Sequence, residues 1–248
     1  MKVKVGCCGF PISMKSYFSK FKLVEVQKTF YDPPRIETSA KWRSKAPEDF
    51  EFSVKAWQVL THPPSSPTWR RMKTVIRRKG ECGFLKPTKE NFKAWERTLE
   101  TCKALKSKVC VLQTPPSFKC AQRNVDNLKK FFESIETDGI KVAWEPRGDW
   151  LQRVEKIGSI CEKFGLIHVV DPLRRRPAAF RETQYFRLHG LHPRKEINYS
   201  YSYSKEDLEK LRVEVERMEK EGAREVYVLF NNLDMVKNAE AFLKIINR

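Results

Sequence analysis

Apolar residues recur along this chain in short runs that end abruptly at proline, glycine or a polar side chain. The clearest run is 109–113, Val-Cys-Val-Leu-Gln, which Thr114 and two prolines follow. Proline has no N–H to donate to a ladder, so this run predicts a buried strand with polar groups at its carboxyl end. Runs of the same kind predict strands over 2–8, 23–31, 50–56, 109–113, 141–145, 166–171, 184–189 and 225–231.

Between most of these runs the apolar spacing becomes helical. The predicted helices cover 16–21, 37–45, 91–105, 124–135, 150–164, 204–220 and 234–246. Ser204 with Asp207 resembles a capping box, and Gly165 is typical of a helix end.

Alternating strands and helices imply parallel strands joined by crossovers, and eight such units in 248 residues predict an α/β fold. The specific expectation is a single TIM (β/α)8-type barrel, one domain over 1–248, with a long third βα connection between 57 and 108. No Gly-x-Gly-x-x-Gly and no phosphate-loop Gly-Lys-Ser/Thr follows any strand, which argues against a nucleotide-binding open sheet.

Charged and amide side chains gather at the predicted strand ends. They are Glu25, Lys55, Gln113, Glu145, Asp171, Arg187, His189 and Asn231. Polar side chains inside a barrel are costly unless paired, and the chemistry of this fold lies at the carboxyl ends of its strands. We therefore expect one mouth of the barrel to carry an active or binding site.

Candidate roles follow from position and residue type. The catalytic candidates are Glu25, Lys55, Glu145 and His189. The substrate-binding candidates are His62 in the loop after the third strand, Gln113, Arg147, Arg187, Asn231 and Asn232.

A structural alternative stays open for several of them. Glu25 is equally consistent with a buried ion pair to Lys55, and Arg147 is consistent with simple neutralisation of Glu145. Asp171, which precedes a proline, is equally consistent with a turn.

The formal net charge is +18, which indicates attraction to polyanions such as nucleic acid or to phosphorylated substrates. A lysine-rich solvated surface is the competing interpretation. The candidate nucleic-acid-binding residues lie in two basic loops and are Arg70, Arg71, Arg77, Arg78, Arg174, Arg175 and Arg176.

The seven cysteines form no Cys-x-x-Cys pair and no cluster with histidine at zinc spacing, which favours a reducing compartment. No apolar run approaches the length of a membrane span, and no signal peptide is evident. We expect a cytoplasmic protein without a membrane partner; the pattern leaves the oligomeric state open.

Seven segments, in this order, resemble the YecE-like family, also known as domain of unknown function 72. They are 24–31, 42–47, 50–55 with Thr61 and His62, 112–118, 144–150, 185–190 and 226–232. The resemblance implies a TIM barrel with a pocket but no reaction, because the activity of the family is not established. The chain departs from the family pattern at Gln27, where asparagine is usual, at Leu233-Asp234, and in the opening 6–10.

Three functions are compatible with this sequence. The first is binding or processing of DNA or RNA, by fold analogy with endonuclease-IV-type barrels, with metal-assisted phosphodiester hydrolysis as its catalytic form. A divalent Mg or Mn ion would then be held by ligands drawn from Glu25, Glu145, Asp171 and His189. In the metal-free form, Lys55, Arg147 and Arg187 grip a phosphate.

The second function is a small-molecule enzyme, an isomerase, lyase or hydrolase, that acts on a sugar or sugar phosphate with Glu25 and Glu145 as acid and base. The third is a non-catalytic protein that binds a ligand or nucleic acid.

Overall fold

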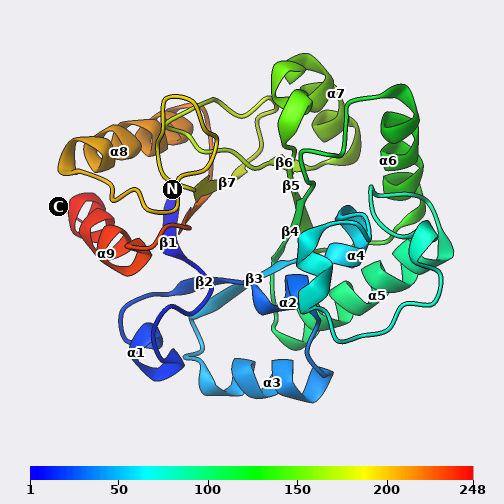
Figure 1. Ribbon diagram of the computed structural model, residues 1–248. Helices are drawn as coiled ribbons and strands as arrows, with labels where there is room; N and C mark the ends of the chain where they lie inside the picture. Colours follow the sequence, from blue (N-terminus) through cyan, green and yellow to red (C-terminus); the bar gives the residue numbers. More distant parts are fainter. Residues whose placement is uncertain (248) are drawn as a thin grey trace. The chain divides into compact units, whose positions relative to one another are not determined.

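The computed structural model describes residues 1–247, in which strands and helices alternate (Figure 1). The strands are β1 (Lys2–Cys8), β2 (Leu23–Val26), β3 (Glu51–Lys55), β4 (Val109–Gln113), β5 (Lys141–Glu145), β6 (Ile167–His168), β7 (Thr183–Leu188) and β8 (Glu225–Phe230). Their order in the sheet is β6-β5-β4-β3-β2-β1-β8-β7, and the pairs with a defined register are parallel. This is the predicted α/β fold of the TIM (β/α)8 type.

Helices follow most of the strands. They are α1 (Met14–Phe18), α2 (Lys28–Tyr31), α3 (Ile36–Lys45), α4 (Gln58–Thr61), α5 (Lys89–Ala104), α6 (Gln122–Ser134), α7 (Val154–Phe164), α8 (Lys205–Lys220) and α9 (Met235–Ile246). Three short 3₁₀ helices are η1 (Pro67–Arg71), η2 (Lys79–Glu81) and η3 (Gly148–Gln152). Within residues 1–247, every helix is too short or too polar to span a lipid bilayer.

The described chain forms two compact units. Unit 1 contains Met1–Glu25, Pro47–Glu51 and the chain from Ile167 onward, and unit 2 contains Val26–Ala46 and Phe52–Leu166. The single domain over 1–248 stays a prediction.

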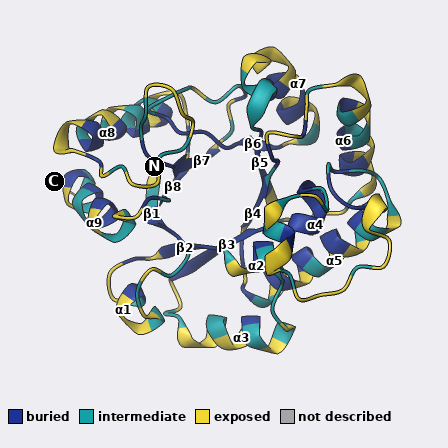
Figure 2. Ribbon diagram, viewed as in Figure 1, coloured by how far each residue is buried: buried dark blue, intermediate teal, exposed yellow. Residues whose placement is uncertain are grey.

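Unit 1 is built on the parallel pairs β2–β1, β1–β8 and β8–β7. Figure 2 shows buried residues on one side of α8 and α9 and exposed residues on the other. On the strands, Lys4 lies opposite Tyr227 and its amine donates to Glu51 at 2.6 Å and to Glu225 at 3.0 Å. Tyr227 also donates to Glu51, so this polar cluster is satisfied internally, as burial requires.

Unit 2 contains the parallel strand pairs β3–β4 and β4–β5. The helices of this unit bury several aromatic side chains. Trp69, Trp95 and Trp150 are buried, and the Trp150 indole donates to the carbonyl of Phe118 at 2.7 Å. Gly148 follows β5 with a φ of +72°, and a Cβ there would lie 2.8 Å from the Pro116 carbonyl oxygen. Only glycine fits this close approach.

Two predicted strands are shorter than expected. The run 23–31 leaves the strand at Val26 and continues as α2, because the Thr29 hydroxyl donates to the carbonyls of Val26 and Lys55 at 2.8 and 2.7 Å. Side-chain bonds to the backbone offer such an alternative to a ladder. The run 166–171 keeps only β6 and an isolated bridge at Val170.

The helix ends agree better with the sequence. Ser204 and Asp207 form the predicted capping box of α8. Gly165 ends α7 in the left-handed conformation, whereas the predicted helix 150–164 divides into η3 and α7.

Candidate functional site

Unit 2 gathers charged side chains at the ends of three neighbouring strands. Lys55, Gln113 and Glu145 are the last residues of β3, β4 and β5. The register pairs Gln113 with Glu145 and Lys55 with Val111, two residues before Gln113, so the three side chains share a face. We name this group, completed by Phe30 from α2 and by His62 and Arg147 from loops, the cationic cluster: Phe30, Lys55, His62, Gln113, Glu145 and Arg147.

Lys55 is 8% exposed and lies among groups suited to a cation. Its amine donates to the Gln113 side-chain oxygen at 2.9 Å and lies 4.0 Å from the centroid of the Phe30 ring. The negative face of an aromatic ring attracts an ammonium group, more strongly when water is excluded. This environment keeps a protonated Lys55 in place.

Glu145 and Arg147 form a close pair. The arginine Nε and a terminal nitrogen donate to the same carboxylate oxygen at 2.9 and 2.5 Å. Both side chains are largely buried, and the Glu145 carbonyl accepts from the backbone of Thr114. Only Pro146 separates the two residues in sequence, so the turn that follows β5 holds the Arg147 guanidinium beside Glu145.

His62 is the unusual member of the cluster. It is 6% exposed, its Nδ1 bonds the Thr61 hydroxyl at 2.8 Å, and its ring meets the edge of Phe30 at 4.9 Å. Burial, and then the charges of Lys55 and Arg147, lower the pKa of His62 to about 3. The ring is therefore neutral at physiological pH, and its Nε2 makes no hydrogen bond to the residues described.

Unit 1 contains a second group, centred on Glu25 and Arg187. The guanidinium of Arg187 donates to Glu25 at 2.9 Å, and the Tyr185 hydroxyl donates to its other oxygen at 2.9 Å. Glu25 is 0% exposed and Arg187 is 1% exposed. The pair joins β2 to β7, which are separated in the sheet by β1 and β8, and such enclosure is typical of a structural ion pair.

Three further predicted residues follow β6, β7 and β8 in unit 1. Asp171 is buried and accepts from the backbone of Leu173 at 3.0 Å, and burial raises its pKa to about 7. His189 is buried with its ring 6.3 Å from that of Tyr199. The Asn231 side chain is half-buried and makes no hydrogen bond within residues 1–247.

Asn232 differs from its neighbour because its amide is used within the loop. Its Nδ2 donates to the Tyr201 carbonyl and to Asn238, both at 2.7 Å. These bonds tie the β8–α9 loop to the β7–α8 connection and to α9.

The first predicted basic loop is exposed. We call residues 67–79 the basic segment; its arginines at 70, 71, 77 and 78 are all exposed. Arg71 stacks on the Tyr31 ring at 3.7 Å, and Asp32 accepts from the backbone of Lys73 and from the Thr74 hydroxyl. The segment is therefore anchored to α2 while its cations face solvent.

The second basic loop is used largely for internal contacts. Arg174 donates to the carbonyls of Gly190 and His192, and Arg175 makes two bonds of 2.8 Å to Glu196. Arg176 is exposed.

The predicted metal ligands do not gather into a metal site. In the part of the chain that the structure describes, no group of three or more His, Cys, Asp or Glu side chains is placed to hold an ion. Glu25 faces Arg187 and Glu145 faces Arg147, which disfavours a divalent cation at either carboxylate. The donor set does not fit Mg or Mn, and we derive no step through a metal.

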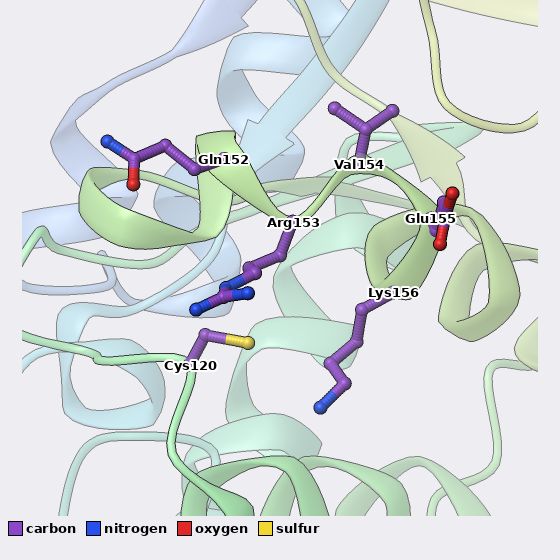
Figure 3. A pocket seen from close by; sticks show the side chains of 6 residues that line it. All are labelled: Cys120, Gln152, Arg153, Val154, Glu155 and Lys156. Atoms are coloured by element: carbon purple, nitrogen blue, oxygen red, sulfur yellow. The ribbon is translucent and has the colours of Figure 1, made fainter.

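A surface depression of about 710 Å³ lies elsewhere in unit 2 (Figure 3). Its lining residues are Cys120, Gln152, Arg153, Val154, Glu155 and Lys156. None of these was predicted from the sequence, because exposed positions at the start of a helix follow no informative pattern. Burial raises the pKa of the Cys120 thiol, so the thiol is not an activated nucleophile.

The structure thus brings the predicted residues together in two groups. Unit 2 joins Lys55, His62, Gln113, Glu145 and Arg147, and unit 1 joins Glu25 with Arg187. Their convergence on one mouth stays a prediction. Sequence reasoning missed Phe30 as a site residue because it assigned that position to a strand.

Proteins of known structure and sequence resemble this chain over nearly its whole length. A Bacillus subtilis protein named UPF0759 protein YunF is 26% identical and covers 94% of this chain and 86% of its own. The crystal structure of a DUF72 family protein from Thermotoga maritima is 26% identical, with a TM-score of 0.75 and full coverage of both chains.

More distant structures share the fold alone. A xylose isomerase domain containing protein from Salmonella typhimurium is 16% identical with a TM-score of 0.56, covering 98% of this chain and 95% of its own. Endonuclease IV from Thermus thermophilus is 10% identical with a TM-score of 0.57, covering 99% and 98%. The family described as "Protein of unknown function DUF72" matches residues 11–248. This chain therefore belongs to the DUF72 family.

Proposed function

We propose that this protein binds nucleic acid through backbone phosphates, with the basic segment as its contact surface. The observation that carries the proposal is the exposure of four arginines on a segment that the protein itself anchors. Phosphate neutralisation by such cations supplies most of the sequence-independent affinity for nucleic acid.

The basic segment is also connected to the cationic cluster within unit 2. The Trp69 indole donates to the His62 carbonyl at 3.2 Å, and Gln58 donates to the carbonyls of Tyr31 and Thr68. These bonds tie the segment to the backbone of His62, a member of the cationic cluster, and to that of Tyr31, which follows Phe30. This proximity favours a phosphate-directed function over an isolated charged surface.

The charge distribution supports the same conclusion. In the basic segment the one described ion pair joins Arg78 to Glu81 at 3.3 Å, where Arg78 stays mostly exposed. Exposed pairs of this kind contribute little, so the segment keeps its attraction for polyanions.

The test measures binding of a labelled single-stranded oligonucleotide by fluorescence anisotropy at increasing KCl. Replacement of Arg70, Arg71, Arg77 and Arg78 by alanine should weaken binding at low salt. It should also reduce the slope of log K against log salt by about 3, at roughly 0.7 per lost phosphate contact.

The matched control replaces four exposed lysines outside the segment, so that net charge falls equally: Lys2, Lys205, Lys210 and Lys220. The control variant should keep most of the wild-type affinity and slope. Equal losses in both variants would show that general charge, and not the basic segment, accounts for binding. Absence of binding by the wild-type protein would refute the proposed function.

A further inference from the structure

The cationic cluster is more enclosed than the basic segment. Lys55, His62 and Glu145 are each at most 8% exposed, whereas the arginines of the segment face solvent. A phosphodiester within a nucleic acid strand is flanked by nucleotides on both sides, so it cannot enter a site this enclosed. A phosphate attached by a single ester bond projects from the molecule that carries it, so it can enter the site.

His62 supplies the observation that points to a ligand. The side chain is more than nine-tenths buried, yet its Nε2 has no hydrogen-bond partner among residues 1–247. The Nε2 atom is not one of the fully buried polar atoms, so this unpartnered ring nitrogen beside two cations is open to a bound group. When the Thr61 hydroxyl donates to Nδ1, the neutral ring carries its proton on Nε2 and offers it as a donor.

The neighbouring groups define the chemistry of that partner. Lys55 and Arg147 contribute two positive charges, Glu145 contributes one negative charge, and His62 is neutral. The cluster therefore keeps a net positive charge with three N–H donor groups. A phosphomonoester carries between one and two negative charges near pH 7 and several acceptor oxygens, so it matches this set better than a diester or a neutral sugar does.

We propose that Lys55, His62 and Arg147 bind the phosphate of a phosphomonoester, carried either at the end of a nucleic acid strand or by a small phosphorylated molecule. Glu145 holds the Arg147 guanidinium in position, and the Phe30 ring forms an apolar wall under the Lys55 amine. The inference rests on the proposed function if the phosphate is at the end of a nucleic acid strand, and it is independent of that function if a small molecule carries the phosphate.

The first arm of the experiment compares two labelled oligonucleotides that differ only in a 5′-phosphate, and a second pair that differs only at the 3′ end. We expect about tenfold or tighter binding of one phosphorylated form, the usual effect of a charge-assisted contact. Lys55→Met should abolish this preference, so that the phosphorylated and unphosphorylated strands bind with the same affinity. The quadruple arginine variant should weaken both forms and keep the preference.

The second arm uses calorimetry with ribose 5-phosphate and ribose. Binding of ribose 5-phosphate but not ribose, without any preference for a strand end, identifies the small molecule as the source. This result would support the inference even if the protein failed to bind polynucleotides, so the two proposals fail separately.

Variants of His62 separate a binding role from a packing role. His62→Phe should reduce the phosphate preference several-fold, whereas His62→Gln, which retains an N–H donor, should restore part of it. Circular dichroism and thermal unfolding verify that each variant folds, and Arg147→Gln replaces Lys55→Met if that variant does not. The inference is overturned if no phosphorylated probe is preferred, or if the preference survives the folded Lys55 or Arg147 variant.

Discussion

His62 makes stability depend on pH in a way that one substitution can isolate. In the folded protein its pKa is about 3, against 6.5 for an unperturbed histidine. Between these values the unfolded chain binds a proton that the folded protein does not, so the free energy of unfolding falls as the pH falls. Each pH unit is worth about 1.4 kcal/mol, or roughly 2.7 kcal/mol over two units below 6.5.

The His62→Gln variant has no such titration. The measurement is urea unfolding of both proteins, followed by tryptophan fluorescence at several pH values from neutral to mildly acidic. We expect the wild-type protein to lose roughly 2–3 kcal/mol more than the variant over those two units. Other groups titrate in both proteins and cancel in the difference. Parallel curves would mean that the pKa of His62 is the same in the folded and unfolded protein, which would refute the argument that burial and two cations lower it.

Two further predictions concern unit 1. Arg187→Met removes the cation beside the fully buried Glu25 and should lower the free energy of unfolding by about 3–5 kcal/mol. Adding Glu25→Gln should recover part of this loss, and urea unfolding measures both variants. A loss below about 1 kcal/mol in the single variant would contradict the importance of the pair. Asp171 has a pKa of about 7, so the stability from its protonated form is present at acidic pH and lost as the pH rises through 7. Asp171→Asn should therefore stabilise the protein above pH 7 by up to roughly 4 kcal/mol, and an unfolding curve unchanged at alkaline pH would show that burial does not raise the pKa of this carboxyl group.

The sequence predicted the fold well because the strand boundaries are chemically marked. Pro115 after β4, Pro146 after β5 and Gly190 after β7 all interrupt a ladder, and the apolar period between them is clear. The error at α2 has a definite cause. Thr-Phe-Tyr favours a strand locally, and the competing hydrogen bond from Thr29 to the Lys55 carbonyl joins residues far apart in sequence, so no local pattern reports it.

The sequence predicted which residues belong to the candidate site, but not which residues they contact. Period-two alternation gave the face of Lys55 and two prolines marked the strand end at Gln113, and the structure shows their side chains bonded to each other. Their contact depends on the register of β3 with β4, which the sequence leaves undetermined. The neutral state of His62 was likewise not predictable, because it results from burial and from two cations that the fold supplies.

The short helix α2 has a consequence for the two surfaces proposed to bind phosphate. Phe30 contacts Lys55 and His62, and the next residue, Tyr31, carries Arg71 on its ring. The Phe30 and Tyr31 rings also pack edge-to-face with their centroids 5.1 Å apart, so the proposed phosphate position and the exposed arginines share one pair of rings. Occupancy at one end should bias affinity at the other, and thermodynamic reciprocity requires the same factor in both directions.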